Sequence, residues 1–263
     1  MSSIPSVQLD DYLSSAIKAS KIAGEKIMQL YGHHGNITTK FDGSPLTIAD
    51  LESHGAIIQE LQPLGIPIVS EEDEARKQVN LYTRYWLIDP LDGTKDFLAK
   101  NDEFTINIAL VENGRPIIGV VYAPALNELY YGSIYRPAIK IKNGLTEIWH
   151  LPPKRMALKM AISRFHDCAE SADFAIRNQI QERIPMGASL KYVKIAFGEI
   201  DVYPRMVGTS EWDTAAGQAI LESVRGGMYD MSTYRPIAYG KHNFRNGKFL
   251  AFRFPYEVTD FIW

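Results

Sequence analysis

Two aspartates stand three positions apart in the stretch WLIDPLDGTKDF, residues 86–97, where an apolar run ends. Asp89 comes directly before Pro90 and Leu91, and Asp92 comes directly before a Gly-Thr pair. Because Pro90 fixes one backbone angle, the two carboxylates and the carbonyl of Leu91 can point toward a common volume. Oxygen ligands of this kind suit a hard cation such as Mg²⁺. Asp-Pro and Asp-Gly pairs are also ordinary turn formers, so this stretch alone leaves a plain loop open.

A second acidic run, SEEDE at residues 70–74, also directly follows an apolar segment. Most acidic runs are solvated, and we expect that of its last two residues. If the two apolar segments are neighbouring strands of one sheet, however, Glu71 lies close to Asp89 and Asp92. Three carboxylates so close would repel one another and raise each other's pKa unless a cation held them together. The sequence therefore predicts a bound metal ion.

The stretch around Asp89 resembles the Asp-Pro-(Ile/Leu)-Asp-Gly-Thr signature of the lithium-sensitive, magnesium-dependent phosphatases related to inositol monophosphatase. EWDTAAGQAIL, residues 211–221, is similar to their second signature, Trp-Asp-x-x-Ala-Gly, and the upstream SEE and TxAD motifs also match. The four motifs occur in the family's order, and the resemblance spans roughly residues 10 to 250. It implies an α+β fold, the layered αβαβα sandwich of inositol monophosphatase and fructose-1,6-bisphosphatase.

Among the branches of that family, the chain is most similar to the bacterial CysQ-type 3'(2'),5'-bisphosphate nucleotidases. Lys95 stands where inositol monophosphatases have a second Thr, and the segments ISRFH (162–166) and GASLK (187–191) also resemble the nucleotidase branch. Asp96 and Phe165 depart from its usual Glu and Ser, and Phe165 is expected to affect substrate affinity without affecting the metal site. The resemblance implies hydrolysis of 3'-phosphoadenosine 5'-phosphate to AMP and phosphate, in sulfur metabolism.

Carried over residue by residue, the resemblance implies two or three Mg²⁺ ions and a group that activates water. Glu71 would help to position the attacking water, and Thr94, hydrogen-bonded to Asp50, would complete the activating group. Asp50 is equally interpreted as the first-turn charge of a capping box, and Asp213 as an N-terminal helix charge. The metal ligands implied by the resemblance are Glu71, Asp89, the carbonyl of Leu91, Asp92 and Asp213.

A bisphosphate substrate carries a second phosphate that these metal ions do not neutralise. By resemblance, the ISRFH and GASLK segments lie beside the nucleotide, with Ser189 and Lys191 best placed for the distal phosphate. Gly93 and Thr94 are expected to open a helix and to present their N–H groups to the scissile phosphate. Taken singly, each cationic residue is more often a surface residue, and His166 is equally a local hydrogen-bonding residue. The expected substrate contacts are Gly93, Thr94, Arg164, His166, Ser189, Lys191, Arg205 and Asp213.

The surrounding patterns indicate the elements that position these residues. Apolar residues at helical spacing predict a helix from about residue 13 to 30, and Thr47 begins a second one that runs through residue 61. Asn113-Gly114 predicts a hairpin within an antiparallel meander. Weak periodicity over residues 135–159 predicts a junction between a 1–155 subdomain with most metal ligands and a 156–263 subdomain with Asp213 and the nucleotide loops. Later helices are expected at 189–197 and 213–223, and strands at 160–162 and 200–203.

Composition excludes several classes of protein. The 28 basic and 31 acidic residues give a net charge of −3, which argues against a nucleic-acid polymer as partner. The single cysteine excludes an intramolecular disulfide. Without a signal-peptide pattern or a membrane-spanning apolar run, we expect a cytoplasmic enzyme, and leave peripheral inner-membrane association and homo-oligomerisation open. Two other functions stay open: inositol monophosphatase or another sugar phosphatase, and a non-catalytic nucleotide or metal sensor.

Overall fold

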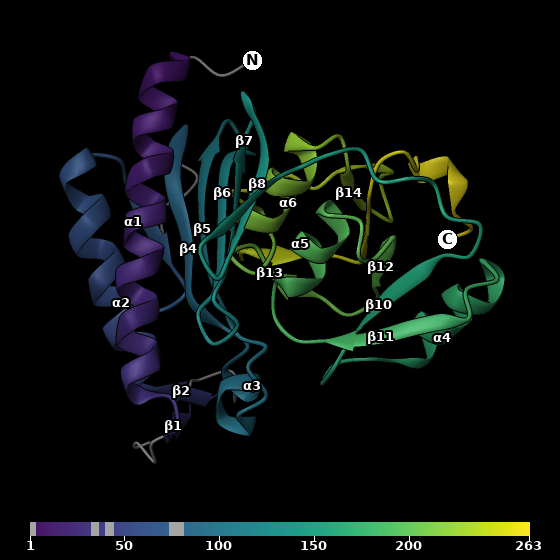
Figure 1. The fold of residues 1–263 in the computed structure, drawn as a ribbon, viewed down its shortest axis with the longest axis horizontal. Coiled ribbons are helices and arrows are strands. Elements are labelled where there is room, and N and C mark those ends of the chain that lie inside the picture. The colour runs from purple at the N-terminus through teal and green to yellow at the C-terminus, as the bar shows by residue number, and fades with distance from the viewer. Residues whose placement is uncertain (1–3, 33–36, 40–44, 74–81) are drawn as a thin grey trace.

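The computed structural model describes residues 4–32, 37–39, 45–73 and 82–263. Glu74, expected at the surface, lies outside the described residues, and Asp73 is partly buried. The chain combines helices with runs of consecutive strands, as expected for an α+β protein (Figure 1). The helices are α1 (Ser6–Leu30), α2 (Ile48–Leu61), α3 (Thr94–Ala99), α4 (Ala169–Arg177), α5 (Leu190–Ala196) and α6 (Ala215–Ser223), with 3₁₀ turns η1 (Gln62–Leu64) and η3 (Val258–Asp260).

A seven-stranded sheet forms the N-terminal half, with its strands in the order β3-β4-β5-β6-β7-β8-β9. β3 and β4 are parallel neighbours, as the acidic runs at their ends required, and the remaining strands form the predicted antiparallel meander. Asn113 and Gly114 both have positive φ and form the predicted hairpin turn between β5 and β6. The strands are β3 (Ile68–Ser70), β4 (Arg84–Asp92), β5 (Thr105–Glu112), β6 (Arg115–Ala123), β7 (Glu128–Ser133), β8 (Arg136–Lys142) and β9 (Leu145–Ile148).

Helices α1 and α2 cover one face of this sheet (Figure 1). On β5, Ile106, Ile108 and Leu110 pack in the core beneath these helices, whereas Ala109 and Val111 belong to the core on the opposite face. This alternation is the period of two that a strand between two covered faces requires. α2 begins as predicted, because Thr47 caps it and its first turn forms a capping box.

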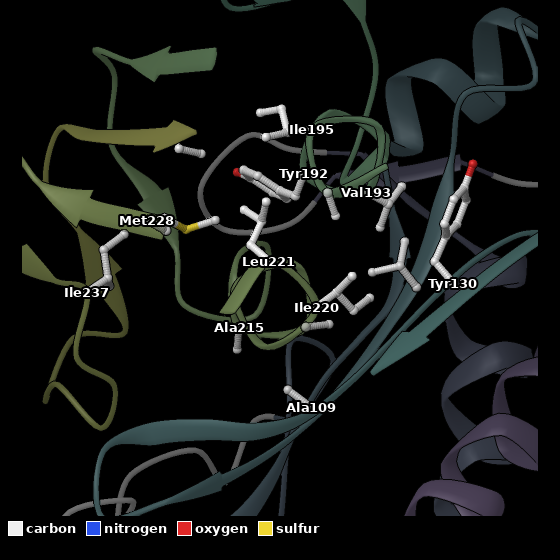
Figure 2. Close-up of a cluster of buried hydrophobic side chains, with 14 of the residues drawn as sticks. Ala109, Tyr130, Tyr192, Val193, Ile195, Ala215, Ile220, Leu221, Met228 and Ile237 are labelled. Carbon is white, nitrogen blue, oxygen red and sulfur yellow. The ribbon is translucent and has the colours of Figure 1, made fainter. Parts of the chain in front are cut away.

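Helices α5 and α6 lie between the first sheet and a second one (Figure 1), and Figure 2 shows their side chains sharing a core with strands on both sides. α6 lies directly against β6, since a Cβ at Gly119 would stand 2.2 Å from the carbonyl oxygen of Ala216. α5 is equally close to α6, where a Cβ at Gly217 would stand 2.5 Å from the ring of Tyr192. These close approaches fix the start of α6, just after Asp213.

The second sheet has six strands in the order β11-β10-β12-β17-β14-β15, of which β10, β11 and β12 run parallel. α4 covers its outer face, where Phe174 packs in one core with Met160 and Leu250. Two short strand pairs, β1-β2 and β13-β16, lie outside the two sheets. The remaining strands are β10 (Lys159–Ser163), β11 (Glu182–Met186), β12 (Val202–Arg205), β14 (Gly227–Asp230), β15 (Arg235–Pro236), β17 (Phe249–Phe252), β1 (Ile37–Thr39), β2 (Pro45–Thr47), β13 (Thr209–Ser210) and β16 (Arg245–Asn246).

The layers therefore follow in the order α, β, α, β, α, which confirms the expected sandwich (Figure 1). Residues 135–159, expected to be irregular, instead contain the last two strands of the first sheet, β8 and the edge strand β9. The division into residues 1–155 and 156–263 stays a prediction. No helix among the described residues combines the length and apolar character needed to cross a lipid bilayer.

Candidate active site

A pocket of about 380 Å³ lies where the two halves of the chain meet. The parallel strands β10, β11 and β12 end at its edge, and the end of β4 with the start of α3 closes it from the other half. Carboxyl ends of parallel strands are the usual place for ligand sites in open α/β sheets. Of the predicted site residues, the pocket is lined by Asp92, Gly93, Thr94, Arg164, His166, Lys191, Arg205 and Asp213.

A β-bulge brings Asp89 and Asp92 onto one face of β4. Asp89 pairs with Asn107 and Asp92 with Thr105, so three steps along β4 match two steps along β5. Residues three apart on a regular strand point to opposite faces, and the extra residue of the bulge corrects this. The sequence suggests a turn after Asp89. In the structure, β4 instead continues through the Asp-Pro-Leu-Asp stretch. The Leu91 N–H donates to Oδ1 of Asp89 at 3.1 Å and holds this buried carboxylate in place.

Two neutral side chains hold the Asp92 carboxylate. Nδ2 of Asn107 and Oγ of Ser189 lie 3.1 and 2.7 Å from its Oδ2. Oγ of Ser189 also lies 2.9 Å from the carbonyl oxygen of Asp213, and the Ser189 side chain is 0% exposed. Burial of this hydroxyl behind Asp92 does not favour the expected contact between Ser189 and a distal phosphate, which stays a prediction. The hydroxyl links Asp92 to the main chain of Asp213.

Asp213 adds a carboxylate from the C-terminal half of the chain. The Ser210 N–H donates to its Oδ2 at 2.9 Å. Burial and the negative charges of Asp92 and Glu71 raise the pKa of Asp213 well above its ordinary value. The Glu71 N–H donates to the carbonyl of Ile88 at 3.1 Å, which fixes Glu71 beside the end of β4. The structure thus shows the repulsion at Asp213, and the mutual repulsion expected among Glu71, Asp89 and Asp92 stays a prediction.

The donors present fit a hard divalent cation. Carboxylates and a main-chain carbonyl are the ligands that Mg²⁺ prefers, and a cation would relieve the repulsion that raises the Asp213 pKa. Across residues 4–32, 37–39, 45–73 and 82–263, no three His, Cys, Asp or Glu side chains converge into a closed ligand cluster. The carboxylates thus lie within electrostatic range of one another without forming a preassembled cage. The ligand roles of Glu71, Asp89, Leu91, Asp92 and Asp213 stay predictions.

Thr94 and Asp50 are in contact, as the sequence predicts. Oγ1 of Thr94 lies 3.3 Å from Oδ1 of Asp50 and 3.3 Å from the carbonyl oxygen of Leu91, so one hydroxyl proton serves two acceptors. Oδ2 of the fully buried Asp50 accepts the N–H and the hydroxyl of Thr47 at 2.7 and 2.6 Å. The capping interpretation and the Thr94-binding interpretation therefore hold together, one on each oxygen of the carboxylate.

A buried lysine and an arginine supply positive charge to the same pocket. Nζ of Lys191 donates to the carbonyl of Ala188 at 2.6 Å and lies 5.3 Å from the centre of the Tyr203 ring. Burial lowers the pKa of Lys191 to about 8. Nη1 of Arg205 donates to the Tyr203 hydroxyl at 3.2 Å, and its Nε donates to the carbonyl of Val207 at 2.9 Å. Because these cations have lost much of their hydration, an anion entering the pocket would interact with them strongly.

Lys95 and His166 meet from opposite sides of the pocket. Nζ of Lys95 lies 3.3 Å from Nε2 of His166. Partial burial, together with the positive charges of Lys95, Arg205 and Lys191, lowers the pKa of His166. The ring is therefore neutral at pH 7, and its unprotonated Nε2 can accept a hydrogen bond from the lysine ammonium group. The local hydrogen-bonding role expected for His166 is present, and its contact with substrate stays a prediction.

Arg164 reaches the pocket as one half of an ion pair. Its Nε and Nη2 lie 3.0 and 2.7 Å from Oε2 of Glu103, a residue that the sequence analysis missed. Sequence reasoning also missed Asn107, although a polar side chain on the inward face of an otherwise aliphatic strand is a recognisable signal. Glu103 leaves no local signal, because its partner lies 61 residues away.

Comparison with known proteins decides the family. The model of the inositol monophosphatase family matches residues 8–248. The chain belongs to the inositol monophosphatase family. The 3'(2'),5'-bisphosphate nucleotidase CysQ of Shigella flexneri is 38% identical over 232 residues, which cover 86% of this chain and 93% of that protein. The CysQ nucleotidase of Salmonella typhimurium is 39% identical over 223 residues, which cover 83% and 90%.

Solved structures of the inositol monophosphatase family share this fold. CysQ from Bacteroides thetaiotaomicron matches with a TM-score of 0.82 and 34% identity, over 92% of this chain and 97% of that one. The extragenic suppressor protein SuhB from Bartonella henselae matches with a TM-score of 0.77 at 21% identity, a likeness of fold alone. The family and the CysQ branch indicated by the motifs are thereby confirmed.

Proposed function

We propose that this protein is a Mg²⁺-dependent 3'(2'),5'-bisphosphate nucleotidase that converts 3'-phosphoadenosine 5'-phosphate to AMP and phosphate. One observation carries the proposal: a single pocket is lined both by carboxylates, Asp92 and Asp213, and by desolvated cations, Lys191 and Arg205. A substrate with two phosphates complements both groups, one phosphate through metal ions on the carboxylates and the other through the cations. An inositol monophosphate would leave the cations without a partner, which costs binding free energy. The CysQ relatives support the same choice.

Glu71, Asp89, the Leu91 carbonyl, Asp92 and Asp213 would hold two or three Mg²⁺ ions. When bound, Mg²⁺ supplies charge neutralisation for the phosphoryl oxygens and a lowered pKa for the attacking water. The chain's own contribution begins at Thr94. Because its hydroxyl proton is directed to Oδ1 of Asp50 and the Leu91 carbonyl, Oγ1 is left as an acceptor for a hydrogen of the attacking water.

The remaining pocket residues would bind and orient the two phosphates. Gly93 and Thr94 would offer backbone N–H groups to the scissile phosphate at the start of α3. Lys191 and Arg205 would pair with the distal phosphate, and His166 would accept from or donate to the nucleotide from beside Lys95. We place this activity in the cytoplasm and in sulfur metabolism, and propose residues 1–155 and 156–263 as two subdomains that both contribute residues to the pocket.

The proposal is tested by measuring phosphate release from 3'-phosphoadenosine 5'-phosphate and from inositol 1-phosphate in parallel, with Mg²⁺ and with EDTA. We expect magnesium-dependent release with a clear preference for the nucleotide. Preference for inositol 1-phosphate would leave the metal chemistry in place and reject the roles given to Lys191 and Arg205. Binding of the nucleotide without release from either compound would favour a non-catalytic sensor and reject the enzyme assignment.

A further inference from the structure

We propose that Glu103 is a positioning residue that holds the two substrate loops of the C-terminal half against the metal-binding half of the molecule. The first loop, residues 163–166, follows β10, and the second loop, residues 185–191, spans the end of β11 and the start of α5. Glu103 lies between α3 and β5, in the other half of the chain. This inference rests on the nucleotidase function proposed above, because it concerns how the same pocket selects a bisphosphate.

A single carboxylate oxygen makes the connection. Oε2 of Glu103 accepts hydrogen bonds from Nε and Nη2 of Arg164, at 3.0 and 2.7 Å. It also accepts one from the backbone N–H of Gly187, at 2.7 Å. The loops are also bound to each other, since the Arg164 N–H donates to the carbonyl of Met186 at 3.2 Å. Hydrogen bonds from a cation and from an amide to one carboxylate are charge-assisted and stronger than neutral ones. Glu103 therefore fixes both loops at once.

Glu103 is itself held rigidly from the metal-binding half. Oδ1 of Asn101 accepts the Glu103 N–H at 3.0 Å, and Nδ2 of Asn101 donates to Oδ1 of the buried Asp96 on α3 at 2.6 Å. The second loop packs against this group without spare room. A Cβ at Gly187 would stand 2.6 Å from Oδ1 of Asp96 and 2.7 Å from the carbonyl oxygen of Glu103. The position of the loop is thus set by α3, which begins at Thr94.

This arrangement fixes the position of the second loop relative to the start of α3, where Asp92 and Gly93 line the pocket. Lys191 belongs to the second loop, and its ammonium group is anchored to the carbonyl of Ala188 in that loop, so the cation moves wherever the loop moves. The charge of Arg164 is matched by Glu103, and Arg164 therefore acts as a tie between the halves instead of a free phosphate ligand. A bisphosphate that contacts both Lys191 and the metal-binding carboxylates depends on their relative position, whereas a monophosphate bound at the carboxylates alone does not.

The experiment compares Glu103→Gln and Glu103→Ala in the full-length protein with Glu182→Gln. Glu182 is a matched control because it lies on β11, the strand that leads into the second loop, and pairs with Lys159 at the surface. The kcat and KM are measured for 3'-phosphoadenosine 5'-phosphate and for adenosine 3'-monophosphate, which lacks the distal phosphate. Both Glu103 variants should raise KM for the bisphosphate about tenfold with kcat nearly unchanged, and shift KM for the monophosphate less than about twofold.

The comparison of the two substrates separates positioning from a loss of stability. The proposal would be overturned if KM changed equally for both substrates. It would also be overturned if KM changed for neither substrate in Glu103→Gln, even if the thermal midpoint fell. Should Glu103→Ala fail to fold, Glu103→Gln decides, because it keeps the volume and one acceptor oxygen. If the wild-type protein releases no phosphate, the proposed function fails. The positioning role of Glu103 is then tested by calorimetry, which measures the affinity of adenosine 5'-monophosphate for wild type and for Glu103→Gln. Equal affinities would overturn that role.

Discussion

Oδ2 of Asp92 lies 2.7 Å from the hydroxyl of Ser189, and this contact joins a carboxylate on β4 to the residue that precedes α5. The same hydroxyl lies 2.9 Å from the carbonyl oxygen of Asp213, in the segment before α6. Asn107 donates to both Asp92 and Ser189. Two predicted metal ligands from opposite halves of the chain are therefore aligned through one buried hydroxyl.

Ser189→Ala is predicted to lower the affinity for magnesium more than it lowers the affinity for the nucleotide. Loss of a partner that orients a metal ligand typically lowers metal affinity or activity about 10- to 100-fold. The Mg²⁺ concentration giving half-maximal phosphate release should rise by that amount, with KM for the nucleotide changed much less. If Ser189 instead bound the distal phosphate, as the sequence suggests, KM would rise while the magnesium dependence stayed as in wild type.

Asp92→Asn should abolish magnesium-dependent phosphate release, with a loss of about 100-fold or more in kcat/KM. The amide can still accept the Ser189 hydroxyl, so the fold should be retained. The thermal midpoint should stay or rise, because one charge is removed from the group that raises the Asp213 pKa. Phosphate-release assays over a range of Mg²⁺ concentrations and a thermal melt check both statements. Wild-type activity with wild-type magnesium dependence would remove Asp92 from the metal site.

Lys191 should give the free enzyme a pH dependence of nucleotide affinity. Its folded pKa of about 8 lies below its ordinary value of 10.5, so above pH 8 it loses the charge that pairs with the distal phosphate. KM for 3'-phosphoadenosine 5'-phosphate should therefore rise above pH 8 in wild type, and be high and flat from about pH 7 to 9 in Lys191→Met. If KM depended on pH in the same way in wild type and in Lys191→Met, the pH dependence would belong to another group.

The lowered pKa of Lys191 weakens nucleotide binding at high pH, but it increases the stability of the fold there. Between pH 8 and 10.5 the unfolded chain binds more protons at Lys191 than the folded protein does. Lys191 alone therefore makes the free energy of unfolding rise with pH through this window. Urea unfolding of wild type and Lys191→Met at both ends of the window should show a smaller pH-dependent gain in the variant.

Asp201→Asn should strongly destabilise the protein, because it removes the charge partner of a buried arginine. Nε of Arg253 lies 2.6 Å from Oδ1 of Asp201, with the two side chains 1% and 0% exposed. Breaking such a pair from one side costs about 3–5 kcal/mol in the free energy of unfolding. Urea unfolding measures this loss, and the surface variant Glu182→Gln should change the free energy by less than about 0.5 kcal/mol. A loss below about 1 kcal/mol for Asp201→Asn would contradict the expectation.

Local signals predicted much of the fold. The spacing of apolar residues in α1, the Thr47 cap of α2 and the Asn113-Gly114 turn each act within a few residues, and each was confirmed. β8 and β9 were missed because Ala138 alone is buried among their residues, so their sequences lack the sustained apolar face that marks a strand. The family motifs indicated the layer order, which no local pattern in the chain encodes.

Prediction of the candidate site was less complete, for a physical reason. Asp92 and Thr94 could be placed because their neighbours in sequence position them. The bulge that turns Asp92 to the same face as Asp89 depends on the register with β5, and the burial of Ser189 depends on packing between the halves. Glu103 could not be found, because a carboxylate in a loop has no pattern until its distant arginine is known.

The pocket separates two properties along the gene. The predicted metal ligands Glu71, Asp89, Leu91 and Asp92 lie before residue 100, whereas Lys191, Arg205 and the loops that face the nucleotide lie after residue 160, together with the remaining ligand, Asp213. Substitutions in these loops that spare Ser189 and Asp213 can therefore alter which phosphate ester is accepted while the hydrolytic centre is inherited unchanged. A protein engineer would accordingly diversify residues 163–166 and Lys191 and leave β3, β4, Ser189 and Asp213 untouched.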